Sequence, residues 1–246
     1  MSATRNIRTV AARELYSYFA SPIAYVFLVI FLGIAGLFTF QLGRLFESNE
    51  ASLNESFFIW HPFLYMVFVP AVGMRLWSEE RRSGSVELLL TMPTTIWQCV
   101  LGKFLAGAFF LGLSLVLTFP VVLTIAYLGN PDGAQVFCGY LGSYLLALGF
   151  LALGSLTSAM TRNQIVSFIL TVVICLLLVF CGWPIITEVL LKIGSPNWLV
   201  NLVESLSVIG HFEGMRRGVL DSRDFLYFLS LIAFGLFGTA AVLKSK

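Results

Sequence analysis

Charge is what this sequence has least of. Only 11% of its 246 residues are Asp, Glu, Lys or Arg, whereas an average soluble domain carries about 25%. Hydrophobic residues make up 58% of the chain, and the formal net charge is +2. This balance argues against a soluble domain, and so small a positive charge, without a basic stripe, predicts no nucleic-acid partner. We therefore expect a chain that lies mostly in lipid.

Signatures of catalysis and metal binding are also missing. The four cysteines form no C-x-x-C pair and have no histidine at ligand spacing, so we expect them to be small buried residues. They are Cys99, Cys138, Cys175 and Cys181. The chain contains neither G-x-S-x-G nor H-E-x-x-H. We predict no catalytic residue, no metal site and no cofactor held by this chain.

A phosphate-binding loop is absent as well. The motif G-x-x-x-x-G-K-[S/T] needs a glycine five residues before its Gly-Lys pair and a hydroxyl residue directly after that pair. Here Gly102-Lys103 has Trp97 at the first of these positions and Phe104 at the second. Any ATP that drives this protein must therefore be hydrolysed by another subunit.

Ionisable side chains hardly enter the apolar stretches of the sequence. Apart from Arg75 at the cytoplasmic end of the second stretch, only His61 and Glu188 come near, each close to the end of such a stretch. Carriers driven by protons or ions usually keep Asp, Glu or His inside the membrane, so this scarcity argues against a secondary carrier. Because His61 precedes Pro62, the pair predicts a kink with a histidine at the membrane interface rather than a proton or metal site.

Six apolar stretches reach the roughly 20 residues that a helix needs to cross a bilayer. Their approximate bounds are 22–43, 57–76, 104–128, 136–160, 165–191 and 225–243. Ser21 is a suitable N-cap for the first span, with Pro22 at its first helical position. The sequence thus predicts an all-α, multi-pass membrane protein in which residues 1–246 form a single transmembrane domain.

Basic and acidic residues are distributed unequally between the two sides. With six spans and the N-terminus inside, ten of the 15 Lys and Arg but only four of the 13 Asp and Glu face the cytoplasm. The positive-inside rule therefore places both termini in the cytoplasm. The connection 76–103 then lies inside, and the long loop 192–224 lies outside.

The connection 76–103 carries the densest charge in the chain. Its charged cluster consists of Glu79, Glu80, Arg81 and Arg82. Gly84 can adopt a positive φ at little cost and so permits a turn. Ser85 can then cap a short helix that has Glu87 in its first turn. A loop of this length and charge predicts a structured docking element rather than a passive tether.

Two further features frame this connection. Thr95 and Gln98 fit a capping box at the start of the next helix. At the N-terminus, residues 5–20 mix apolar and basic side chains in a pattern typical of an amphipathic helix in the inner membrane interface. The alternative for this segment is a charged flank that only sets the topology.

The order of these elements resembles a known family. The connection reads 79-EERRSGSVELLLTMP-93, Gly102-Lys103 opens the third span, and the segment before the last span reads 209-IGHFEGMRRGVLDSRDFLYFLSL-231. Together with six spans, these motifs resemble the permease subunits of type-2 ABC exporters over essentially the whole chain. The branch that they resemble includes permeases associated with gliding motility and with nitrous-oxide-reductase maturation.

The resemblance implies that the helix after the second span is a coupling helix seated in a groove of a cytosolic ATPase. That ATPase, present in two copies, would bind ATP and magnesium. The residues implied in the contact are Glu79, Glu80, Arg81, Arg82, Gly84 and Glu87. The other implied partners are a second permease, identical or a sister chain, and membrane lipids. The implied location is the bacterial cytoplasmic (inner) membrane.

The outer loop and the transport pathway are described by the same resemblance. The family-like residues before the last span are His211, Phe212, Glu213, Gly218 and Asp221. They would form an outer gate or a contact for an external accessory protein, and a connector that rests on the membrane is the alternative. Candidates for gating or lining the pathway are Pro62, Pro70, Thr171 and Pro184. In the family the seam between permeases lies chiefly between the first and fifth spans.

Two other functions remain compatible with the sequence. A membrane anchor or sensor could dock a cytosolic protein through the same connection without transporting anything. A secondary carrier would move its substrate without an ATPase. The apolar spans do not indicate which substrate an exporter of this kind would move.

Overall fold

The computed structural model describes residues 3–43, 52–84, 95–129, 131–192 and 196–245. Within these ranges the chain is helical and forms no strand. In chain order its helices are α1 (Ala3–Ala20), α2 (Pro22–Leu37), the π-helix η1 (Phe38–Leu42), α3 (Leu53–Ser56), the 3-10 helix η2 (Phe58–Trp60), α4 (His61–Gly73), α5 (Arg75–Ser83), α7 (Ile96–Val116), α8 (Phe119–Leu128), α9 (Gly133–Met160), α10 (Gln164–Phe180), α11 (Pro184–Lys192), α12 (Asn197–Ser205), α13 (Val208–Arg216) and α14 (Ser222–Lys244).

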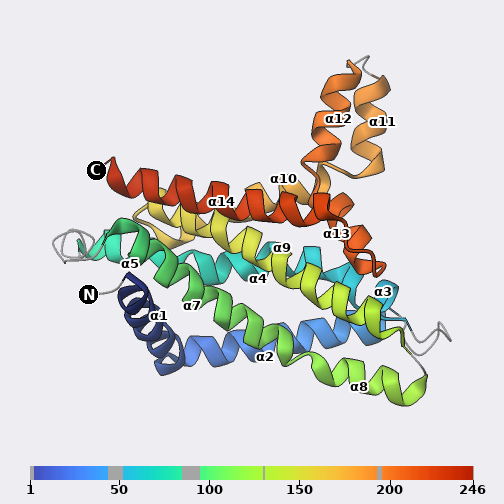
Figure 1. Ribbon diagram of the computed structural model, residues 1–246, viewed down its shortest axis with the longest axis horizontal. Helices are drawn as coiled ribbons and strands as arrows, with labels where there is room; N and C mark the ends of the chain where they lie inside the picture. The colour runs from blue at the N-terminus through green and yellow to red at the C-terminus, as the bar shows by residue number, and fades with distance from the viewer. Residues whose placement is uncertain (1–2, 44–51, 85–94, 130, 193–195, 246) are drawn as a thin grey trace.

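The long helices run roughly side by side along one axis of the molecule (Figure 1). Both termini and α5 lie at one end of this bundle, which we call the terminal end. The short helices α3 and α13 lie at the opposite end, which we call the distal end. There α11 and α12 form a hairpin that projects away from the bundle.

Five helical stretches in the described part of the chain are long and apolar enough to cross a membrane. They are Pro22–Leu42, Leu53–Ser83, Ile96–Leu128, Gly133–Met160 and Ser222–Lys244. Each overlaps one of the spans predicted from the sequence, which confirms a polytopic, helical membrane protein. Ser21 caps the first stretch as predicted, because its Oγ accepts a hydrogen bond from the backbone N–H of Ile23 at 3.3 Å.

The predicted span 165–191 is wrong as a single helix. Its first part forms α10, which has 17 residues and is shorter than the five stretches above. The chain then leaves the helix at Gly182 and Trp183 before α11 begins. The cause is Pro184, because a proline disfavours the helical conformation of the residue before it.

The two prolines of the predicted second span act differently from each other. Pro62 is the second residue of α4 and follows the 3-10 helix η2, so its missing N–H costs little there. Pro70 lies inside α4, where it removes one backbone hydrogen bond. Thus Pro70 can bend a helix, as predicted, whereas Pro62 marks the beginning of one.

His61, which the sequence predicts to lie at the membrane interface, packs inside the bundle, and its depth in the membrane stays a prediction. Its side chain is fully buried, and its Nδ1 lies 2.5 Å from the Oγ of Ser143 on α9. The rings of Phe57 and Phe58 pack edge-on against the imidazole. The polar contact comes from another helix, so the sequence around His61 does not indicate it.

The helix α9 is the centre of the bundle, and α4, α5, α7, α10, α13 and α14 all pack against it. Small residues permit this crowding. A Cβ on Gly73 of α4 would lie only 3.0 Å from the Cα of Gly154, so the two backbones touch. A Cβ on Gly235 of α14 would lie 2.6 Å from the carbonyl carbon of Ala152. The small residues of α9 are therefore used for packing within the chain.

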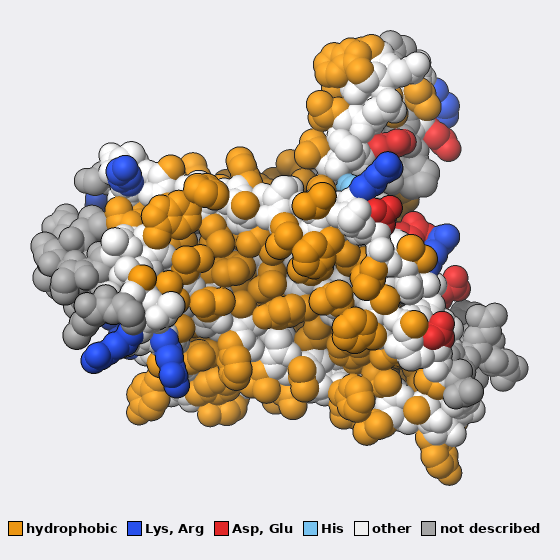
Figure 2. All heavy atoms as spheres, viewed as in Figure 1, with side chains coloured by type: hydrophobic (Ala, Val, Ile, Leu, Met, Phe, Trp, Pro, Cys, Tyr) orange, Lys and Arg blue, Asp and Glu red, His pale blue; other side chains and the backbone are white. Residues whose placement is uncertain are grey.

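Acidic side chains gather toward one end of the bundle on the face that Figure 2 shows. On the visible face, apolar side chains cover the middle, the Asp and Glu lie toward the distal end, and Lys and Arg occur at both ends. This distribution agrees with the charge asymmetry of the sequence. The cytoplasmic location of the terminal end stays a prediction based on that asymmetry.

Candidate functional site at the terminal end

The junction between α4 and α5 leaves backbone groups inside the bundle without partners in their own helix. One residue separates the two helices, so the first N–H groups of α5 have no regular acceptors. Ser158 of α9 supplies an acceptor for two of them. Its Oγ accepts hydrogen bonds from the N–H groups of Trp77 and Ser78, both at 3.0 Å. The same hydroxyl donates to the carbonyl of Met74 at 2.8 Å. One side chain of α9 thus fixes the start of α5.

Two more contacts hold α5 on the central helix. The indole Nε1 of Trp77 donates to the Oγ of Ser155 at 3.1 Å, and Thr239 of α14 donates to the same Oγ at 3.3 Å. Near the other end of α5, the guanidinium of Arg81 donates to the carbonyl of Ala159. The position of α5 is therefore tied to that of α9 along most of its length.

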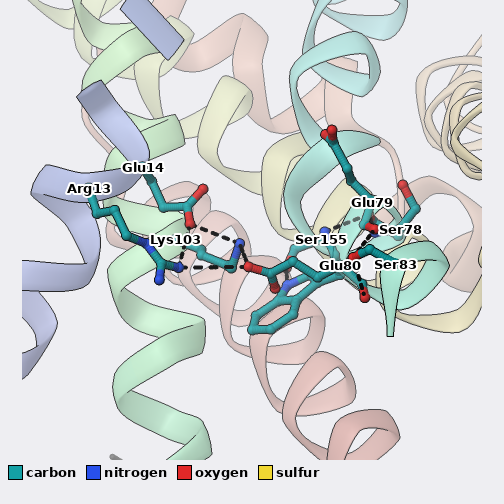
Figure 3. Close-up of polar contacts among 10 residues, drawn as sticks. Arg13, Glu14, Ser78, Glu79, Glu80, Ser83, Lys103 and Ser155 are labelled. Atoms are coloured by element: carbon teal, nitrogen blue, oxygen red, sulfur yellow. Dashed lines mark hydrogen bonds and ion pairs between the residues drawn. The ribbon is translucent and has the colours of Figure 1, made fainter. Parts of the chain in front are cut away.

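A buried ion-pair cluster joins α5 to two further helices (Figure 3). The Nζ of Lys103 on α7 lies 2.9 Å from Oε1 of Glu80 on α5 and 3.1 Å from Oε1 of Glu14 on α1. Arg13 of α1 approaches the same two carboxylates, at 3.1 Å from Glu14 and 3.7 Å from Glu80. We call Arg13, Glu14, Glu80 and Lys103 the terminal charge cluster.

The burial of this cluster makes each of its charges depend on the others. The side chain of Lys103 is 3% exposed, and those of Glu14 and Glu80 are 17% and 18% exposed. A buried charge costs several kcal/mol unless an opposite charge and hydrogen bonds face it. The cluster meets this need with two cations and two carboxylates. The Trp77 ring, whose centroid lies 5.1 Å from Nζ, adds a cation–π contact.

Gly102 explains how α1 comes close enough to take part. A Cβ at this position would lie 2.8 Å from the Cβ of Val10 and 3.1 Å from the carbonyl oxygen of Ile7. Only glycine leaves room for α1 to lie on α7 at this point. The next residue, Lys103, then meets the carboxylate that α1 brings. The Gly-Lys pair noted in the sequence is thus a packing and charge-pairing unit.

The capping box predicted at the start of α7 is present. The Oγ1 of Thr95 accepts from the N–H of Gln98 at 3.4 Å, and the Oε1 of Gln98 accepts from the N–H of Thr95 at 3.3 Å. That Oε1 also accepts from the side-chain amide of Asn6 on α1 at 3.0 Å. The cap therefore begins α7 and anchors α1 as well.

The predicted coupling residues divide into two groups. Glu80 and Arg81 turn toward the bundle, as described above, whereas Glu79 and Arg82 are exposed. Gly84 follows α5 with φ of 75°, the left-handed conformation predicted from a glycine at that point. Glu87, like the helix predicted around it, lies outside the described residues.

Nearly the whole chain matches a family model, that of the ABC-2 family transporter protein, over residues 8–234. The matched range includes the terminal charge cluster and all of α5. The chain belongs to this family. No match was found among curated proteins. As a member of this family, the chain is a transmembrane permease of an ABC transporter. It is a membrane component of the transporter rather than a catalytic domain, and its partner is an ABC ATPase subunit.

Thr171, a predicted pathway residue of the permease, is fully buried between α10 and α9. Its Oγ1 lies 2.6 Å from the Oγ1 of Thr157 and donates to the carbonyl of Ser167 at 2.7 Å. Within a single chain it therefore fastens two helices together and faces no open surface. Its predicted role in the pathway stays a prediction.

The predicted gating prolines are spread over the permease rather than gathered at one place. Pro70 is buried within α4, and Pro184 is the first residue of α11. Pro62 helps to line an apolar pocket of about 350 Å³ at the distal end. Trp183 lines the same pocket, so the break in the predicted fifth span borders on the start of α4.

The family-like segment of the outer loop joins several short elements at the distal end. His211 of α13 places its Nδ1 2.7 Å from Oδ1 of Asp224 on α14 and its Nε2 3.2 Å from the carbonyl of Ser205 at the end of α12. Its ring stacks on that of Tyr227, with the centroids 4.1 Å apart. His211 thus connects three helices.

The other four residues of this segment have local structural tasks. Phe212 is 2% exposed and packs on α9, and Glu213 pairs with Arg217. Gly218 has φ of 90°, which favours glycine, and Asp221 caps α14. These tasks place the segment firmly on the bundle, and its predicted contact with an external partner stays a prediction.

Some residues of the site have no counterpart among the sequence-based candidates. Lys103 and Glu14 were not predicted to meet, and neither were Ser155 and Ser158 predicted to hold α5. A usable signal exists for the lysine, which stands two turns inside an otherwise apolar helix. Another exists for the two serines, which lie three residues apart and therefore on one face of α9.

Proposed function

We propose that this permease is the transmembrane subunit of an ATP-driven exporter and that the energy enters it through α5. The observation that supports this is the attachment of α5 to three other helices at once, through Ser158 of α9, Lys103 of α7 and Arg13 of α1. Because packed helices transmit displacement rather than absorb it, a push on α5 would move all three.

The surface offered to the ATPase would begin with the exposed residues Glu79 and Arg82 and continue through Gly84 and Glu87. Side chains of both signs suit a complementary soluble surface and help to fix the register of docking. Glu80, which faces Lys103, would shape the contact by holding α5 in place rather than by touching the ATPase.

The complete exporter would contain two ATPase copies, each binding ATP and magnesium, and a second permease. An apolar face of α10 supports this arrangement, because it is exposed in the single chain at a spacing that places its residues side by side. These residues are Ile165, Ile169, Val173 and Leu177. The seam would join this face to the first span of the second permease, α2.

The remaining parts of the proposal concern location and direction. The protein would reside in the bacterial inner membrane, with the terminal end in the cytoplasm and export toward the distal end. The projecting α11–α12 hairpin would be the place for an external accessory protein. Within the family, the motifs around α5 and α13 favour the branch of the gliding-motility and nitrous-oxide-reductase-maturation permeases.

Co-purification with the energy-supplying subunit tests this proposal. The tagged permease is extracted from its native membranes in a mild detergent, and we expect a protein with a G-x-x-x-x-G-K-[S/T] motif and ATPase activity to accompany it. The double variant Glu79→Arg with Gly84→Pro should lose that partner and the activity. Glu204→Arg, an exposed charge reversal on α12, is the matched control and should retain both.

Three results would contradict the proposal. The coupling assignment fails if the double variant keeps both the bound ATPase and transport. A docked protein whose activity never responds to the permease would indicate an anchor or sensor. Transport that persists without any ATPase, and that a protonophore abolishes, would indicate a secondary carrier.

A further inference from the structure

A second pocket, distinct from the apolar one at the distal end, opens beside the terminal charge cluster. It has a volume of about 340 Å³ and lies among α1, α2, α4, α5 and α7. Ligand pockets usually measure about 300–1,000 Å³, so its size suits a small headgroup or part of a larger amphiphile. Its lining combines the charged residues Glu14, Arg75 and Glu79 with apolar residues that include Phe27 and Phe110, and we call these apolar residues the apolar wall.

Arg75 is the unusual residue of this pocket. Its Nε is buried and has no hydrogen-bond partner, and its side chain forms no ion pair in the described part of the chain. A buried N–H donor without an acceptor is costly, so an anion that accepts from this Nε would stabilise the Arg75 side chain. The charge of Arg75 is felt locally, because it opposes the rise in the pKa of Tyr18 that burial causes. The pocket therefore presents a buried N–H donor of Arg75 that has no acceptor.

Carboxylates stand near this cation without neutralising it. Glu79 is four residues from Arg75 on α5 and thus on the same face of the helix, yet the two form no ion pair. Glu79 also pairs with no other described cation. Glu14, by contrast, is already held by Lys103 and Arg13. The pocket thus presents one unmatched cation and one unmatched carboxylate above an apolar wall.

We propose that this pocket binds the headgroup of a zwitterionic glycerophospholipid of the phosphatidylethanolamine type. The phosphate would lie on Arg75, the ammonium group would face Glu79, and the beginning of an acyl chain would cover Phe27 and Phe110. A purely anionic headgroup would bring a negative charge against Glu79 and Glu14. A free phosphate would leave the apolar wall uncovered.

Such a lipid would touch both α1 and α5, so it would add a link between the membrane and the helix through which we propose that energy enters. This goes beyond the proposed function, since a lipid bound here would steady α5 whether or not the chain is an exporter.

The test uses the full-length permease, purified, delipidated and mixed with single lipids in a native mass-spectrometry titration. We expect phosphatidylethanolamine to bind at least about tenfold more tightly than phosphatidylglycerol of the same chains, the difference produced by roughly one charge–charge contact. Arg75→Gln should weaken binding of both lipids about tenfold. Arg162→Gln, which removes an exposed cation elsewhere, should change neither.

A second variant, Glu79→Gln, tests whether Glu79 binds the ammonium group of the lipid. Glu79 is exposed, so Glu79→Gln should fold normally, and it should abolish most of the preference for phosphatidylethanolamine while leaving phosphatidylglycerol binding unchanged or stronger. The proposal is overturned if both variants bind both lipids as the unaltered permease does. It is equally overturned if phosphatidylglycerol binds better, or if millimolar inorganic phosphate displaces the lipid.

Discussion

The ion pairs at the two ends of the permease differ in how far they are exposed to solvent. At the terminal end, Lys103 is 3% exposed and faces two carboxylates that are less than one-fifth exposed. At the distal end, Glu213 pairs with Arg217, and these side chains are 40% and 63% exposed. The His211–Asp224 pair of the same end is more buried, and its side chains are 23% and 15% exposed.

This difference shows where the fold can tolerate change. An exposed ion pair contributes roughly 0–1 kcal/mol, because water replaces either partner at little cost. Breaking a buried pair costs several times more, since the remaining charge has no water around it. The buried pairs of the terminal end therefore hold α5 in one position, whereas the exposed Glu213–Arg217 pair of the distal end contributes little to the position of α13. Four changes test this contrast.

Lys103→Met should have the largest effect. It removes a cation that is 3% exposed and lies against both Glu14 and Glu80, and such a loss costs about 3–5 kcal/mol. For a chain of this size that corresponds to a fall of roughly 10 °C in the midpoint of thermal unfolding, measured in detergent. Lys244→Met, which removes an exposed cation at the same end, is the control and should shift the midpoint by less than about 2 °C.

Gly102→Val should separate α1 from α7. The added side chain would overlap Val10, and overpacking of this kind costs about 1–3 kcal/mol. The direct measurement is a disulfide between cysteines placed at Asn6 and Gln98, whose side chains are in contact in the structure. We expect it to form at least about tenfold more slowly in the valine variant, since a shift of 1.4 kcal/mol changes an equilibrium tenfold. Gly33→Val, at an open position, should leave the rate unchanged.

Ser158→Ala should loosen the start of α5 without removing any charge. It leaves the N–H groups of Trp77 and Ser78 and the carbonyl of Met74 without their partner, at a cost of about 1–3 kcal/mol. Amide hydrogen exchange at Trp77 and Ser78 should accelerate about tenfold or more. Ser230→Ala removes an exposed serine of α14 and should leave these exchange rates unchanged. Equal acceleration in both variants would contradict the role of the Ser158 hydroxyl in holding the start of α5.

The sequence predicts the parts of this fold that depend on local patterns. Hydropathy indicates the five membrane-length helical stretches of the described residues. The residue types at helix ends correctly predict the Ser21 cap, the Thr95–Gln98 capping box and the left-handed Gly84. Each of these depends on neighbours within a few residues, which the sequence displays directly. Pro184 is also a local signal for the break between α10 and α11, although hydropathy predicts one continuous span there.

The remaining features depend on contacts between distant segments, which no local pattern shows. Glu80 looks like a free surface charge in the sequence, yet Lys103 of another helix turns it inward. His61 lies near the end of an apolar stretch and before a proline, and neither feature indicates its buried contact with Ser143 on α9. The sequence thus displays the charged residues of the site, but it does not show which helices bring them together.

His211→Gln should have the smallest effect and should respond to salt. Glutamine can keep one donor toward Asp224 or Ser205 but not both, so we expect a loss of about 1 kcal/mol and a fall of roughly 2–4 °C in the unfolding midpoint. When the imidazole of His211 is protonated, its contact with Asp224 is a partly exposed ion pair, and 1 M salt should then shrink this difference, while the effect of Lys103→Met should persist. A fall as large and as salt-resistant as that of Lys103→Met would mean that both ends are equally rigid. The distal hairpin would then move with the bundle rather than adjust on it.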